Sequence, residues 1–179
     1  MNPIRDLPGL RCELLAELEI AARQLAAIAE AIPAERYDWR PDTDARSVSE
    51  VFVHVAAGTF LLLDHVGTPV PSELYGSFPP DRLERLSAIV RKNDDMEKTV
   101  RDKPAVLALL TRSLESARSA LVAAHNDELG RHLDENTTVW RVYIRLVAHT
   151  HEHMGQMIAY LRTNGLRVPW PDWRPDRQT

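Results

Sequence analysis

The chain has 179 residues, of which 44% are hydrophobic and 27% are charged, and this balance fits one soluble globular domain with its own core. Its formal net charge of -4 argues against a basic surface that would attract nucleic acid or an anionic membrane. The single cysteine, Cys12, excludes an internal disulfide.

Residues 1–10 lack the apolar stretch of a signal peptide. No uninterrupted apolar run reaches the roughly 18 residues of a membrane span. We therefore expect a cytoplasmic protein without a membrane or nucleic-acid partner.

The first half of the chain carries two helical patterns. Residues 10–31 are rich in Ala, Leu and Glu, and Pro33 ends this pattern because proline disrupts a helix interior. Residues 47–67 begin at Ser47, which stands three residues before Glu50 in the spacing of a capping box, and they end at Gly67. The two patterns predict two long helices joined by a turn-rich linker.

The connection that follows, residues 68–102, is the least regular part of the chain. It holds four prolines, and its charged stretch at residues 82–98 favours a short helix with a solvated face. A third long helix is predicted from Pro104, a residue favoured in the first turn, to about His125. A fourth covers residues 138–164 and ends at Gly165.

These patterns predict an all-α fold. The sequence shows no strand-like alternation and no internal repeat, so we expect a four-helix bundle with one long crossover connection. We expect residues 1–179 to form a single domain. Residues 166–179, with three prolines and two tryptophans, are expected to form a non-helical C-terminal tail.

The fourth helix contains the motif "HTHEHMGQ", in which three histidines fall within five positions. At about 100° of rotation per residue, His149 and His153 lie about 40° apart, at one edge of the apolar face. His151 lies about 200° from His149 and points elsewhere. Two imidazoles one turn apart can bind one metal ion, although two solvated or capping histidines would show the same spacing.

A third ligand is expected from the second helix, which is apolar on almost every side and carries His54 in its middle. An imidazole buried without a partner is unfavourable by about 1–3 kcal/mol, so His54 needs a hydrogen bond or a metal ion. A neighbouring polar group would satisfy it as well. With His149 and His153 it would give three neutral imidazoles, which leave open positions as catalytic metal sites do.

Other residues near this set have alternative interpretations. His65 is about 16 Å along the helix from His54, too far to share one ion. Glu50, one turn before His54, either completes the capping box or orients the imidazole. Gly58, one turn after His54, either opens space near the metal or serves helix packing.

The sequence resembles the DinB/YfiT-like family of metal-dependent enzymes. The resemblance rests on "IPAERYDWRPDTDARSVSEVFVHVA" around His54, on "AHTHEHMGQMIAYLRTNGLRVPW" near the C-terminus, and on the long gap between them. It implies a bundle of up-down-down-up topology, often dimeric, with a divalent metal held by residues that match His54, His149 and His153. It also implies kinship with S-transferases and isomerases that use low-molecular-weight thiols such as bacillithiol and mycothiol.

Three functions follow as hypotheses. The first is a divalent-metal-dependent enzyme acting on a small molecule, most similar to a thiol S-transferase, with metal-assisted hydrolysis as the alternative chemistry. The second is a non-catalytic metal-binding or stress-related protein, and the third is a structural helical dimer. Three imidazoles suit Zn, Ni, Fe or Co. The sequence spacing identifies no further catalytic residue.

A homodimer is predicted from the second helix. Its apolar surface exceeds what one bundle interface requires, and a symmetric contact with a second copy would bury the excess.

Overall fold

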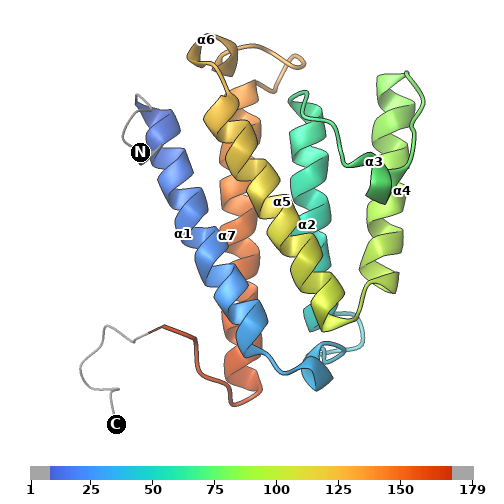
Figure 1. Cartoon of the computed structure of the whole chain (residues 1–179), viewed down its shortest axis with the longest axis vertical. Helices are drawn as coiled ribbons and strands as arrows, with labels where there is room; N and C mark the ends of the chain where they lie inside the picture. The colour runs from blue at the N-terminus through green and yellow to red at the C-terminus, as the bar shows by residue number, and fades with distance from the viewer. Residues whose placement is uncertain (1–8, 171–179) are drawn as a thin grey trace.

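Four long helices form the body of the protein. The computed structural model describes residues 9–170, and its bundle consists of α1 (Leu10–Ala31), α2 (Val48–His65), α5 (Lys103–Ala123) and α7 (Val139–Thr163). Helices α1 and α2 each pack against both α5 and α7. In Figure 1, α1 and α7 run in one direction while α2 and α5 run in the other, which is the up-down-down-up arrangement. The predicted all-α bundle is confirmed.

The helices begin where side chains can satisfy their free N–H groups. At the start of α2 the Ser47 side chain accepts from the Glu50 N–H, and the Glu50 carboxylate accepts from the Ser47 N–H, so the predicted capping box is present. Asp102 caps α5, which has Pro104 in its first turn, and Thr138 caps α7. All four predicted helices end within two residues of their expected positions.

The connection between α2 and α5 is more regular than expected. It contains the short helix α3 (Ser72–Tyr75) and a fifth long helix, α4 (Arg82–Thr99), which packs along α2 (Figure 1). Two further short elements, η2 (Ala34–Arg36) and α6 (Asn126–Leu129), lie in other connections.

Helix α4 is held to α2 by one inward face. Ile89, Asn93 and Met96 recur at helical spacing on this face and are buried. The Asn93 amide donates to the Ala57 carbonyl at 3.1 Å, and Arg85 Nε donates to Asp64 at 2.9 Å. The charged residues that suggested a solvated face occupy the rest of the helix surface, so composition alone hid the buried stripe.

Helix α2 is the centre of the fold. It packs against α4, α5 and α7, and its large apolar side chains Val51, Phe52, Val55 and Phe60 are buried. Among the described residues it is the one helix long and apolar enough to qualify as a membrane span by composition, but 61% of it is buried inside the protein. This fits the core helix of a soluble protein.

The packing of α4 also bears on assembly. The sequence predicts a homodimer because the apolar surface of α2 exceeds what one bundle interface can cover. Within a single chain α4 covers that additional side of α2. The homodimer therefore stays a prediction. The apolar surface of α2 supports it less strongly, because α4 covers part of that surface.

Candidate metal centre

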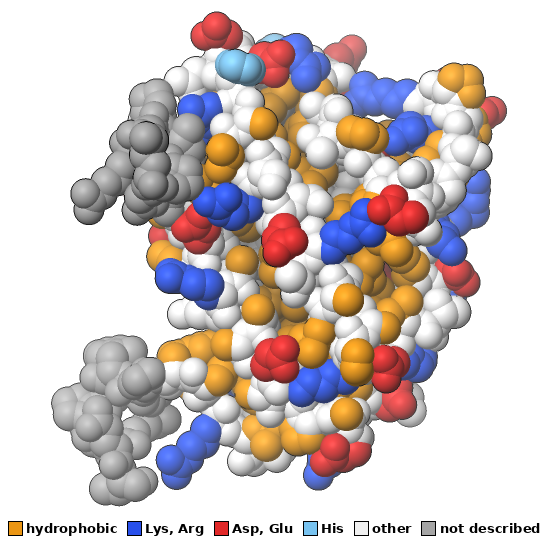
Figure 2. Space-filling model, in the orientation of Figure 1, with side chains coloured by type: hydrophobic (Ala, Val, Ile, Leu, Met, Phe, Trp, Pro, Cys, Tyr) orange, Lys and Arg blue, Asp and Glu red, His pale blue; other side chains and the backbone are white. Residues whose placement is uncertain are grey.

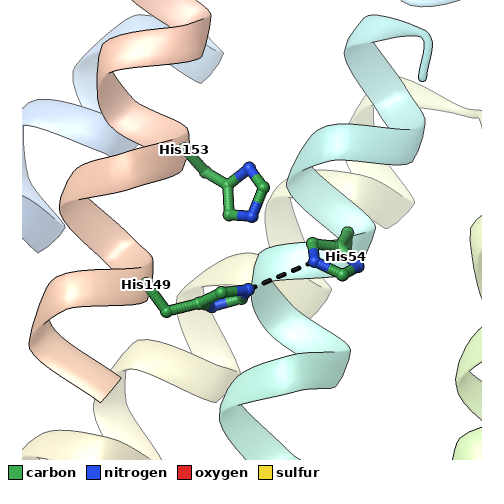
Figure 3. A group of neighbouring side chains, drawn as sticks. All are labelled: His54, His149 and His153. Carbon is green, nitrogen blue, oxygen red and sulfur yellow. Dashed lines mark hydrogen bonds between the residues drawn. The ribbon is translucent and has the colours of Figure 1, made fainter. Parts of the chain in front are cut away.

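Three histidines from two helices meet between α2 and α7. His54 projects from α2, and His149 and His153 project from α7, one turn apart (Figure 3). Each offers one ring nitrogen, and these three atoms lie within 4.8 Å of one another. The Nε2 atoms of His54 and His149 are 3.2 Å apart. The structure thus brings together the three predicted site residues.

A carboxylate orients His54. Glu97 of α4 places Oε1 2.6 Å from Nδ1 of His54, and its Oε2 accepts from Nε of Arg46 at 2.8 Å. Burial alone would raise the pKa of Glu97, but hydrogen bonds from His54 and Arg46 together hold that pKa below its usual range. An ionised carboxylate can only accept, so Nδ1 of neutral His54 carries the proton.

A chain of hydrogen bonds orients His153 in the same way. The Tyr160 hydroxyl donates to the Arg46 carbonyl at 3.0 Å, so its oxygen accepts from the Gln156 amide N–H, also at 3.0 Å. Gln156 therefore turns its amide oxygen toward Nδ1 of His153, 2.8 Å away. That oxygen accepts, which places the proton on Nδ1 of His153.

Both networks leave Nε2 of the histidine without a proton. With protons on Nδ1, His54 and His153 each present a bare Nε2 lone pair, the state in which an imidazole binds a metal. Nitrogens about 2.0–2.1 Å from a tetrahedral zinc lie about 3.3 Å from each other, close to the 3.2 Å that separates His54 from His149. The three imidazoles are a donor set that fits a divalent metal ion, and the His54–His149 spacing matches that of two zinc ligands, within a group whose three atoms lie up to 4.8 Å apart.

Packing, and not a hydrogen bond to Nδ1, holds the His149 ring in place. It is only 7% exposed, and among the described residues its Nδ1 has no hydrogen-bond partner. Its ring lies against Gly58 of α2, where a Cβ atom would come within 2.8 Å of Cε1. Burial, followed by the nearness of His153 and His54, lowers the pKa of His149 to about 4. The imidazole is therefore neutral near pH 7.

Gly58→Ala should weaken metal binding by about tenfold. The α2 backbone is held by its packing, so the new Cβ atom would push the His149 ring out of its place. Calorimetric titration of the chelator-treated protein measures the change. Gly155→Ala is the matched control: this α7 glycine has open space around its Cβ position, so alanine should leave metal affinity unchanged. Equal affinity in Gly58→Ala and wild type would contradict the packing argument.

The metal-free protein should lose stability as pH falls from 6.5 to 4. The folded pKa of His149 is about 4, below the unfolded value near 6.5, so the unfolded chain binds more protons in this window. The contribution of neutral His149 to the free energy of unfolding is complete above pH 6.5, and it is smaller by about 2 kcal/mol at pH 5. Urea unfolding with chelator measures the free energy. His149→Gln should show a weaker pH dependence, and an identical dependence would refute the assignment.

The remaining candidates lie elsewhere. His151 points toward α1, where its Nε2 is 3.5 Å from a Glu17 oxygen. His65 lies near Arg82 and Asp134 at the far end of α2. Glu50 completes the capping box and pairs with two arginines instead of orienting His54.

Sequence reasoning missed the residues that orient the histidines. Glu97 lies in the connection that was expected to be solvated, and only its place beside buried Met96 could have indicated an inward position. Gln156 follows His153 by three residues and precedes Tyr160 by four, a spacing that puts all three on one helix face. That signal was available in the sequence.

A family model described as the DinB superfamily matches residues 17–157, which include all three histidines as well as Glu97 and Gln156. The chain belongs to the DinB superfamily. No curated protein matches this DinB chain. Family membership and the histidine cluster together fit a metal-binding protein.

Proposed function

We propose that this DinB protein is a divalent-metal-dependent enzyme that transfers a low-molecular-weight thiol to a small molecule, with His54, His149 and His153 as the metal ligands. The observation that carries the proposal is the pair of hydrogen-bond networks that leave Nε2 of His54 and His153 bare. A divalent ion with three imidazole ligands keeps further positions open and lowers the pKa of a coordinating thiol or water. Its identity is Zn, Ni, Fe or Co.

Thiol transfer ranks above hydrolysis because of the family resemblance. The metal centre itself does not separate the two reactions, since a divalent ion lowers the pKa of a bound water as well as that of a bound thiol. Glu97 is the carboxylate in contact with the histidines, and both its oxygens are engaged, one by His54 and one by Arg46. Glu97 thus orients a ligand and is not available as a general base in either reaction.

Two alternatives remain as proposals of lower rank. A metal-dependent hydrolase would use the same three histidines with a base outside the observed contacts. A non-catalytic metal-binding or stress-related protein would bind the ion without turnover. The cytoplasmic location and the homodimer rest on the sequence alone.

Metal analysis followed by an activity screen tests the proposal. The purified protein is loaded separately with each of the four metals and assayed with several low-molecular-weight thiols and 1-chloro-2,4-dinitrobenzene as electrophile. The proposal expects thiol-dependent turnover that disappears in His54→Ala and with chelator. Turnover of ester substrates without a thiol would support the hydrolase, and stoichiometric metal without any turnover would support the binding protein.

A further inference from the structure

A groove lies along the C-terminal half of α2, between α4 and α7. Its walls come from α4 and α7, its floor is the C-terminal half of α2, and its volume is about 420 Å³. This volume lies in the range typical of small-molecule sites. Most of the lining is apolar, contributed by Leu61, Leu62, Leu86, Val90 and Val142.

The apolar wall is partly open to solvent. Val90 of α4 is 43% exposed, although it lines the groove with the half-buried Leu86 one turn before it. Covering such side chains contributes about 25 cal/mol per Å² of apolar area. The groove therefore favours an occupant with an apolar body.

The α7 wall adds positive charge. Arg141 and Arg145 line the groove, and the Arg141 side chain has no ion-pair or hydrogen-bond partner within residues 9–170. Arg145 pairs with Glu152 at 2.8 Å, but both side chains are about half exposed, and such surface pairs contribute only about 0–1 kcal/mol. A carboxylate flanked by apolar surface can therefore replace Glu152.

The groove lies next to the histidines. Arg145 precedes His149 by one turn of α7, and Leu61 follows His54 by seven residues, about 10 Å along α2. Gly58, which contacts His149, lies between them on the same helix. The end of the groove at Arg145 and Leu61 is thus the end nearer the metal centre.

A second groove, of about 350 Å³, lies between α1 and α5. Its arginine Arg118 is already paired with Glu19 at 2.9 Å. Figure 2 shows this face of the molecule with acidic and basic side chains interspersed among apolar ones. The groove between α4 and α7, in contrast, combines apolar walls with Arg141, which has no side-chain partner within residues 9–170.

We infer that this groove binds the small-molecule substrate and that the substrate is an amphipathic carboxylate. Its apolar body lies against Leu61, Leu62 and Val90, and its carboxylate contacts Arg141 and Arg145. The carboxylate on Arg145 is then the part of the molecule nearest His149, which follows Arg145 by one turn of α7. The ligand's role as a substrate rests on the proposed function, but its binding to the groove needs no metal.

Calorimetry with octanoate and 1-octanol as probes tests the inference on the full chain. Octanoate should bind wild type at least about tenfold more tightly than it binds Arg141→Gln/Arg145→Gln, since each charge-assisted hydrogen bond to a carboxylate is strong. Octanol should bind wild type at least about tenfold more weakly than octanoate. Arg162→Gln, an exposed position at the other end of α7, is the matched control and should bind octanoate as wild type does.

The outcomes separate this inference from the proposed function. Metal-free His54→Ala should keep its octanoate affinity, so failure of the metal chemistry leaves this test intact. Thermal melts establish that each variant is folded. The inference is overturned if octanoate does not bind wild type, if the double variant binds it equally well, or if octanol binds as tightly as octanoate.

Discussion

Alanine at His54, His149 or His153 should each remove most of the bound metal, whereas alanine at His151 should leave metal content nearly unchanged. An ion with three protein ligands loses one third of its protein coordination in each of the first variants. His151 lies on the other side of α7, where its ring faces Glu17 of α1. His151 is only two residues from both His149 and His153 in the sequence.

Metal stoichiometry and thermal melts on the four variants measure this effect. A ligand present at about 100 times its Kd stabilises the folded state by about 2.7 kcal/mol, which corresponds to about 5–10 °C in Tm for a domain of this size. Chelator should therefore lower the Tm of wild type and His151→Ala by this amount and hardly affect the other three. If His151→Ala empties the site while His153→Ala keeps it, the register of α7 described above is wrong.

Glu97→Leu should weaken metal binding by about 10–100-fold, the usual effect of removing a residue that orients a metal-bound histidine. The carboxylate fixes the proton on Nδ1 of His54 and also connects the ring to Arg46. Without it, His54 can place its proton on Nε2 and lose the lone pair that faces the cluster.

The matched control is Asp95→Asn, an exposed carboxylate on the same helix, 59% accessible, which within residues 9–170 pairs with Lys92 alone. Its metal affinity should equal that of wild type. Nitrogen NMR of the imidazoles gives a readout that a merely structural role would not change: His54 should report a proton on Nδ1 in wild type and a mixture in Glu97→Leu. An unchanged affinity in Glu97→Leu would show that Glu97 does not orient the site.

Helical periodicity predicted one part of the site from sequence alone. It placed His149 and His153 on one face of the fourth helix and His151 away from them, and the structure agrees. The pairing with His54 depended on which helix packs beside α7, and periodicity carries no information about that. The place of His54 in the middle of an apolar helix suggested it, and the family resemblance agreed. Helix ends were predicted well because Ser47, Asp102 and Thr138 act locally.

The residues that orient the ligands were harder to predict for a physical reason. Glu97 reaches His54 across 43 positions, through a helix that composition had marked as solvated. Its inward position follows from Ile89, Asn93 and Met96, whose burial depends on contacts with α2 that no local pattern encodes. Arg46 joins both networks, one through its side chain and one through its carbonyl, and only the folded chain brings these together.

X-ray absorption on the zinc-loaded protein tests the central claim most directly. Three imidazoles predict nitrogen neighbours at about 2.0–2.1 Å with the outer-shell scattering of three histidine rings. A sulfur neighbour at about 2.3 Å would instead indicate Cys12, and the scattering of one imidazole or none would indicate adventitious binding. A spectrum with three imidazoles in wild type is the predicted result, and either of the other spectra would contradict the assignment of His54, His149 and His153.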